Sequence, residues 1–390
     1  MALTTLKLQL LMCLLAVAGL VVSVWWIWPR LSARTWPAII GRVCVLLGNQ
    51  LLTFLAVALA VNNYFGFYAG WNDLFGTGDD AVAPIVADAG GNGAGPGQAG
   101  GVQVVRTTRA PSDGKGSPAG RLQQVVISGS ASGLSAPAYV YLPPEYSEKR
   151  YARTRFPAIV ALTGYPGDAR NLITRMNMPM VAASAVHRHE MPPTVLVLMR
   201  PTVAPPRDTE CMDVPDGPKV ETFFTKDVPS SLAGAYRLGS DAASWGILGA
   251  STGGYCALKM GMRHPEAYSA VASLSGYYRA PIDATTGDLF GGDRRLQNEN
   301  DLMWRITHLP PPPISVLVAT SEKGESNYRA TLDFLAAVRP PMQASSLILP
   351  SGGHNFNTWS REVPQALPWL AQQLRVPADP APAVTPSPPS

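Results

Sequence analysis

The chain has 390 residues, of which 46% are hydrophobic and 15% are charged, an apolar-rich composition for a soluble enzyme. The formal net charge is +4 and there is no basic block, which argues against nucleic acid as a partner. No residue spacing resembles a zinc site, and no phosphate-binding glycine loop precedes a suitable helix, so no metal site is expected.

The apolar excess lies at the amino terminus. Residues 6–28 contain one charge, Lys7, and at about 1.5 Å per residue a helix there would be roughly 34 Å long, enough to cross a bilayer core. A second apolar segment covers residues 39–61. We therefore predict a membrane anchor, residues 1–75, with two transmembrane helices. A cleaved signal peptide is the alternative for the first segment, but the second span and the tryptophan cluster at 25–28 favour an anchor.

Charge predicts the orientation of the two spans. Arg30, Arg34 and Arg42 lie in or beside their short connection, and positively charged connections stay in the cytoplasm. Both termini and everything after the second span are then extracytoplasmic, in a multi-pass protein whose anchor contacts membrane lipid.

Composition divides the rest of the chain. Residues 76–120 are rich in Gly, Ala and Pro and predict a flexible linker, and residues 376–390 predict a disordered Pro-rich tail. Between them, residues 121–375 alternate strand-like and helix-like segments, which predicts an α/β domain with a mainly parallel sheet. The expected strands are 123–127, 138–142, 156–162, 194–199, 245–248, 270–274, 314–319 and 346–349. The expected helices are 169–185, 222–236, 252–263, 328–338 and 363–374.

The central motif is Gly249-Ala250-Ser251-Thr252-Gly253, between a predicted strand and a predicted helix. Gly-x-Ser-x-Gly in that context predicts a nucleophile elbow, in which the serine sits on a sharp turn with its hydroxyl exposed. Ser251 is then the nucleophile, and the Thr252 amide at the helix N-terminus can hold an oxyanion. The alternative is a glycine-rich turn with an ordinary serine.

A second loop follows the strand at 156–162. Thr163-Gly164-Tyr165-Pro166-Gly167 lies at the carboxyl edge of the sheet, where α/β enzymes place their sites. We predict that the Tyr165 backbone amide is the second oxyanion donor, whereas the alternative is a simple Pro-Gly turn.

In this fold the order of the triad is serine, acid, histidine, so the base must follow Ser251. His354 lies in a glycine loop directly after the last predicted strand and is the predicted base. His264 and His308 are more typical of structural histidines.

The acid should follow the penultimate strand, where Glu322 and Glu325 are both available. Glu322 is nearer the strand end and is preferred, with Glu325 as the alternative.

The four cysteines divide by compartment. Cys13 and Cys44 lie in the predicted spans and suit apolar packing. Cys211 and Cys256 lie in the predicted exported domain, where disulfides persist, so we predict a bridge between them.

Taken together, Leu162-Thr163-Gly164-Tyr165, the segment 220–229, the elbow and Gly352-Gly353-His354-Asn355 resemble the Putative esterase family of α/β-hydrolases. That family includes the actinobacterial mycolyltransferases and the esterase D group. The resemblance covers residues 121–375 and implies an α/β-hydrolase fold, an acyl-enzyme and no cofactor. It also implies an acyl ester or lipid substrate.

The resemblance leaves the acyl acceptor open. Water is the acceptor in esterases, and a sugar hydroxyl such as that of trehalose is the acceptor in mycolyltransferases. The membrane anchor, the linker and Cys211 depart from the secreted mycolyltransferases. We therefore expect a membrane-anchored extracytoplasmic serine esterase or acyltransferase. A mycolyltransferase, a non-catalytic envelope binding module and a peptidase are the alternatives.

Overall fold

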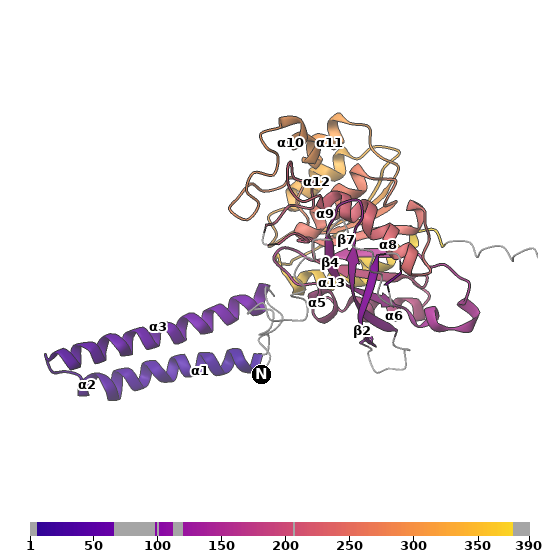
Figure 1. Cartoon of the computed structure of the whole chain (residues 1–390). Coiled ribbons are helices and arrows are strands. Elements are labelled where there is room, and N and C mark those ends of the chain that lie inside the picture. Colours follow the sequence, from indigo (N-terminus) through magenta and orange to yellow (C-terminus); the bar gives the residue numbers. More distant parts are fainter. Residues whose placement is uncertain (1–5, 66–97, 100, 112–119, 206, 377–390) are drawn as a thin grey trace, which may run out of the picture. The chain divides into compact units, whose positions relative to one another are not determined.

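The computed structural model describes residues 6–65, 98–99, 101–111, 120–205 and 207–376 (Figure 1). The chain divides into two compact units, Met1–Ala81 and Val82–Ser390. The apolar segments fall in the first unit, and the α/β domain falls in the second.

The first unit is a pair of antiparallel helices. Helix α1 (Leu6–Val22) continues through a π-helical turn at Ser23–Ile27 into α2 (Trp28–Arg30), and α3 spans Trp36–Phe65. Within the part of the chain that the structure describes, two stretches are long and apolar enough to cross a membrane, Leu6–Arg30 and Trp36–Asn63. Asn49 donates from Nδ2 to Ser23 Oγ at 2.7 Å, so an amide in the middle of α3 is satisfied by the other helix.

The second unit is built on a ten-stranded sheet with the order β1-β2-β3-β4-β6-β5-β7-β8-β9-β10. Strands β1 to β4 pair antiparallel, β4 also pairs antiparallel with β6, and the remaining pairs are parallel. The central strands are continuous apolar runs, because a parallel strand with helices on both faces has no side exposed to water. The strands are β1 (Gln98–Ala99), β2 (Val102–Arg109), β3 (Arg121–Ser128), β4 (Ser135–Leu142), β5 (Ala158–Leu162), β6 (Val195–Met199), β7 (Trp245–Ala250), β8 (Ala270–Leu274), β9 (Ser315–Ser321) and β10 (Gln343–Leu349).

Helices cover both faces of the sheet, and each face has its own apolar core. One core packs the sheet against α7 to α9, α11 and α12, and the other packs it against α5, α6 and α13. The helices of this unit are α5 (Arg170–Thr174), α6 (Met178–His187), α7 (Val220–Thr222), α8 (Val228–Ala235), α9 (Thr252–Arg263), α10 (Arg294–Asn300), α11 (Leu302–His308), α12 (Tyr328–Ala337) and α13 (Phe356–Gln372). The predicted mainly parallel α/β fold is confirmed.

The predicted linker is wrong over residues 102–109. This segment is β2, which pairs with β3 along its length through one irregularity between Val104 and Arg106. The glycine-rich average of residues 76–120 concealed a short run of Val and Thr, residues that favour strands. Most of the rest of the predicted linker, and residues 377–390 of the predicted tail, lie outside the described residues.

Candidate active site

Ser251 occupies a sharp turn between β7 and α9, at the carboxyl edge of the sheet. Its φ of 56° and ψ of −121° are strained values for a side-chain-bearing residue. The flanking glycines are required by close backbone approach, since a Cβ on Gly249 would lie 2.0 Å from the Gly253 carbonyl oxygen. A Cβ on Gly253 would lie 2.3 Å from the carbonyl oxygen of Thr163. The expected nucleophile elbow is therefore present in the structure.

His354 reaches Ser251 from the loop between β10 and α13. Its Nε2 lies 2.7 Å from Ser251 Oγ, a hydrogen bond between a base and a nucleophile separated by 103 residues. The loop is fixed by the next residue, Asn355, whose side chain accepts from the amides of Asn357 and Thr358 and caps α13. The Trp359 ring packs edge-on against the imidazole at 5.3 Å.

The acid that faces His354 is Glu325, and the preference for Glu322 is wrong. Glu325 Oε1 lies 3.7 Å from His354 Nδ1. Its Oε2 accepts from the Ser321 amide at 2.7 Å and from Thr320 Oγ1 at 3.2 Å. Glu322 is exposed, and its amide donates to the Leu349 carbonyl, so only its backbone takes part in the structure here.

A tight turn explains the difference between the two glutamates. Gly324 adopts a φ of 96°, and a Cβ there would lie 2.0 Å from the Gly352 carbonyl oxygen. Because the chain reverses at this glycine, Glu322 faces solvent and Glu325 turns inward. Gly324 directly precedes Glu325, but the reversal depends on Gly352 of another loop and was not evident from the sequence.

Further polar groups behind the triad were not found from the sequence. Trp359 Nε1 donates to Ser275 Oγ at 2.9 Å. Burial alone would raise the pKa of Glu325, but the nearby His354 and Ser275 and the hydrogen bond from the Ser321 amide hold it below its usual value. Glu325 is therefore a carboxylate at neutral pH. Burial, assisted by the charge of Glu325, raises the pKa of the fully buried Glu362 to about 8.

The loop after β5 passes directly beside the nucleophile. A Cβ on Gly164 would lie 2.9 Å from Ser251 Cβ, so only glycine allows this approach. The loop is closed by Thr163 Oγ1, which donates to the Gly167 carbonyl at 3.0 Å, and by the Gly167 amide, which donates to the Gly164 carbonyl at 2.8 Å. The backbone at Gly164 and Tyr165 thus lies at the site, and the role of the Tyr165 amide stays a prediction.

The predicted disulfide is present. Cys211 and Cys256 are bridged with their Cα atoms 5.7 Å apart, which joins the loop before Met212 to α9. Cys256 lies one helical turn after Thr252, so the bridge is anchored close to the nucleophile.

His264, His308 and the segment 220–229 make contacts outside the triad. His264 Nε2 lies 2.7 Å from Glu221 Oε1, and Arg263 Nε donates to the same oxygen at 2.6 Å. The Asp227 carboxylate accepts from two amides of the turn before β4. His308 stacks on Trp304 with the ring centroids 4.6 Å apart.

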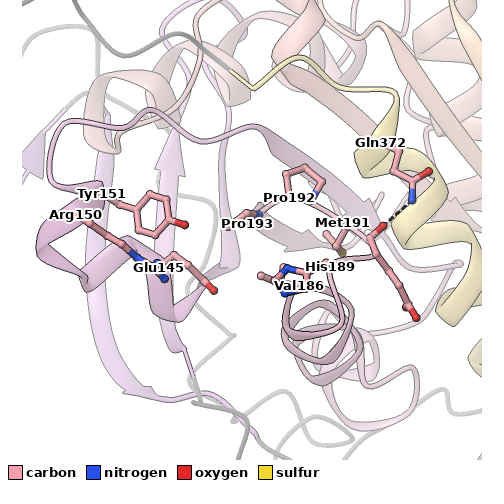
Figure 2. Close-up of a pocket in the computed structure, with 10 residues that line it drawn as sticks. Glu145, Arg150, Tyr151, Val186, His189, Met191, Pro192, Pro193 and Gln372 are labelled. Atoms are coloured by element: carbon pink, nitrogen blue, oxygen red, sulfur yellow. Dashed lines mark hydrogen bonds between the residues drawn. The ribbon is translucent and has the colours of Figure 1, made fainter.

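A separate cavity of about 560 Å³ opens at the amino ends of β5 and β6 (Figure 2). Strands β5 and β7 are parallel, and Ser251 follows the carboxyl end of β7, so this cavity lies at the opposite edge of the sheet from the triad. It is lined by Glu145, Arg150, Tyr151, Val186, His189, Glu190, Met191, Pro192, Pro193 and Gln372. Among the described residues, no group of three or more His, Cys, Asp or Glu side chains is placed to hold a metal ion.

Comparison with known proteins agrees with this geometry. Residues 130–370 match the family described as Putative esterase. The chain belongs to this family. An uncharacterized protein of Corynebacterium glutamicum is 26% identical in an alignment of 270 residues. The match covers 65% of this chain and 62% of that protein, which is less than two thirds of the relative.

Solved structures share the fold of this esterase-family chain. A ferulic acid esterase covers 65% of it and is itself covered to 98%, with a TM-score of 0.55 and 19% identity. An S-formylglutathione hydrolase from Agrobacterium tumefaciens covers 70% and is covered to 99%, with a TM-score of 0.56 and 15% identity. A fluorophosphonate-binding serine hydrolase of Staphylococcus aureus covers 65% and is covered to 98%, with a TM-score of 0.52 and 14% identity. The expected serine-hydrolase class and α/β-hydrolase fold are confirmed.

Proposed function

We propose that this member of the esterase family is a membrane-anchored, extracytoplasmic enzyme that cleaves carboxylic esters through an acyl-enzyme. The observation that carries the proposal is the 2.7 Å contact between His354 Nε2 and Ser251 Oγ on a strained elbow. A serine in this conformation, within reach of an imidazole that is itself backed by a buried carboxylate, is equipped for nucleophilic attack.

The reaction then proceeds in two matched halves. Ser251 Oγ attacks the acyl carbonyl while His354 Nε2 takes its proton, and the same proton passes to the leaving alcohol. An acceptor hydroxyl is next deprotonated by His354 and attacks the acyl-enzyme, and His354 passes that proton to Ser251 Oγ as the acyl–serine bond breaks. Glu325 holds the imidazole and stabilises its cation during both halves. We assign the oxyanion to the backbone amides of Thr252 and Tyr165.

The nature of the acceptor decides between hydrolysis and transfer. The His354 side chain is 49% exposed, so an acceptor can approach the base from solvent. Resemblance to the mycolyltransferases supports a sugar hydroxyl, and the esterase family as a whole supports water. We propose an acyl ester or lipid as donor, and the product formed with added trehalose distinguishes the two acceptors.

The extracytoplasmic location rests on the first unit and on the disulfide. Arg30 and Arg42 lie near the helix ends that meet at the connection, and Arg42 Nη2 donates to the Ala33 carbonyl at 3.2 Å. A positively charged connection favours the cytoplasm, which leaves the α/β unit outside. The Cys211–Cys256 bridge suits that oxidising side of the membrane.

Two experiments test the proposal. The purified full chain in detergent should hydrolyse activated esters of graded acyl length, and Ser251→Ala should abolish turnover. Absence of turnover from a folded sample would favour a non-catalytic binding module, and cleavage of peptides in preference to esters would point to a peptidase. A reporter fused after Gly76 should be active only outside the cytoplasm, and cytoplasmic activity would overturn the topology.

A further inference from the structure

Three side chains along one face of α9 are linked to the same short loop, two of them directly and one through a tyrosine. Thr252, Cys256 and Lys259 are spaced i, i+4 and i+7, which places them in one row on the helix. The loop is Asp208–Cys211, which we name the clamp loop. Each link is of a different chemical kind, and the indirect one starts at Thr252, the residue that follows the nucleophile.

Two of these contacts fix the backbone of the clamp loop. Lys259 Nζ is buried and donates to the Glu210 carbonyl at 2.7 Å, and Cys256 is bridged to Cys211. Glu210 and Cys211 adopt φ values of 49° and 52°, in the left-handed region that such residues avoid. The surrounding contacts therefore hold the loop in a conformation that it would not keep alone.

The third contact runs through a tyrosine. Tyr277 follows β8, and its hydroxyl oxygen lies 2.6 Å from both carboxyl oxygens of Glu210 and 3.0 Å from Thr252 Oγ1. The Tyr277 ring stacks on Tyr255 of α9 with ring centroids 5.1 Å apart, which fixes its direction. A continuous hydrogen-bonded path thus joins a buried carboxyl group to the side chain beside Ser251.

The protons available to Glu210, Tyr277 and Thr252 determine the direction of each hydrogen bond along this path. The Tyr277 hydroxyl carries one proton, so when Glu210 is ionised it donates to the carboxylate and must accept from the Thr252 hydroxyl. When Glu210 is protonated, its own proton can go to Tyr277, which is then free to donate to Thr252 Oγ1. In both states the Thr252 hydroxyl has a fixed partner, and the first turn of α9 is tied to the clamp loop.

We propose that Glu210, acting through Tyr277, is a positioning residue for the oxyanion amide of Thr252. The inference rests on the proposed function, because it assigns a task to that amide in acyl transfer. Displacing an oxyanion donor costs turnover more than ground-state binding, since the donor interacts most strongly with the transition state.

The charges around Glu210 predict a pH dependence of turnover, which is a second way to test the proposal. Burial, together with the charges of Asp208 and Asp283, raises the pKa of Glu210 to about 8, although the Tyr277 hydrogen bond and Lys259 oppose this. Burial raises the pKa of Asp208 to about 6 and lowers that of Lys259 to about 8. Glu210 therefore gains its negative charge as the pH rises through about 8, and a charge placed there opposes an oxyanion.

The test compares three variants of the full chain in detergent. Tyr277→Phe removes the path, Glu210→Gln removes the ionisation but keeps an acceptor, and Tyr278→Phe is the matched control. The Tyr278 hydroxyl donates to Thr331 Oγ1 at 3.0 Å and belongs to a different buried contact. Each protein is assayed for kcat and KM with an activated ester, for the pH dependence of kcat, and for thermal unfolding.

The expected result is a fall in kcat of about 10-fold for Tyr277→Phe with KM nearly unchanged, and no change in kcat for Tyr278→Phe. Wild-type kcat should fall as the pH rises through about 8, and Glu210→Gln should lose that alkaline fall. Should Tyr277→Phe fail to fold, the isosteric Glu210→Gln still carries the test.

Two results would overturn the inference while the proposed function stands. One is a Tyr277→Phe enzyme with wild-type kcat, and the other is an unaltered alkaline fall in Glu210→Gln. An inactive wild-type chain that is folded and does not react with a fluorophosphonate would instead overturn the proposed function.

Discussion

Replacing Glu325 by Gln tests the assignment of the acid. The substitution keeps the shape of the side chain and an oxygen that can accept from the Ser321 amide, but it removes the negative charge. In the structure that charge lies 3.7 Å from His354 Nδ1. The loss should therefore appear in turnover, because the imidazole gains a positive charge when it takes the Ser251 proton.

The magnitude follows from the distance. At 3.7 Å and an effective dielectric constant of about 20, suited to a half-exposed histidine, the attraction between imidazolium and carboxylate is about 4 kcal/mol. If that attraction is lost in the transition state, kcat/KM should fall about 1000-fold. The Gln side chain can still accept from the Ser321 amide, but because the folded-state pKa of Glu325 is lowered, loss of the charge should also lower the free energy of unfolding at neutral pH.

The assay is hydrolysis of an activated ester by the full chain in detergent, with thermal unfolding as the check on folding. Glu322→Gln is the matched control and should keep wild-type activity, since Glu322 is exposed. Loss of activity in Glu322→Gln with Glu325→Gln fully active would refute the reasoning, and so would two fully active variants.

Three further predictions concern residues that hold the elbow, the disulfide and the contacts at the end of α9 in place. Gly253→Ala should lose at least about 100-fold in activity or fail to fold, because its Cβ would lie 2.3 Å from a backbone carbonyl; a fully active variant in the ester assay would contradict this. Removing the bridge with Cys211→Ala and Cys256→Ala opens a sequence separation of 45 and should lower the free energy of unfolding by about 4 kcal/mol in urea titrations; an unchanged midpoint would contradict the estimate. Burial alone would lower the folded-state pKa of His264, but hydrogen bonds to two glutamates raise it. The stability that His264 contributes is therefore complete below its ordinary pKa and is lost as the pH rises through the raised pKa. His264→Gln should therefore cost more stability at about pH 6 than at about pH 9, and an equal cost at both would be the contrary result.

The parts of the site that are local in sequence were predictable. The elbow around Ser251 could be recognised because the close backbone contacts that require its glycines arise within a motif of five residues. His354 follows the last strand in a glycine loop, and the order of the triad in this fold leaves few alternatives. The buried, apolar central strands were found for a similar reason, since parallel strands read as continuous hydrophobic runs.

The parts of the site that depend on tertiary contacts could not be predicted from the sequence. The choice between Glu322 and Glu325 turns on the reversal at Gly324, whose close neighbour Gly352 comes from another loop. Glu210 and Tyr277 meet across 67 residues, and neither lies in a recognisable motif. Strand β2 was missed because its pairing with β3, and not its glycine-rich surroundings, makes it a strand.

The most direct test of the central claim is the intact mass of the full chain after treatment with a fluorophosphonate. The account predicts a single covalent adduct that maps to Ser251 and is absent from Ser251→Ala, because only a serine paired with His354 at 2.7 Å is activated for the reaction. A folded wild-type chain that gains no adduct, or an adduct that persists in Ser251→Ala, would contradict the assignment of the nucleophile.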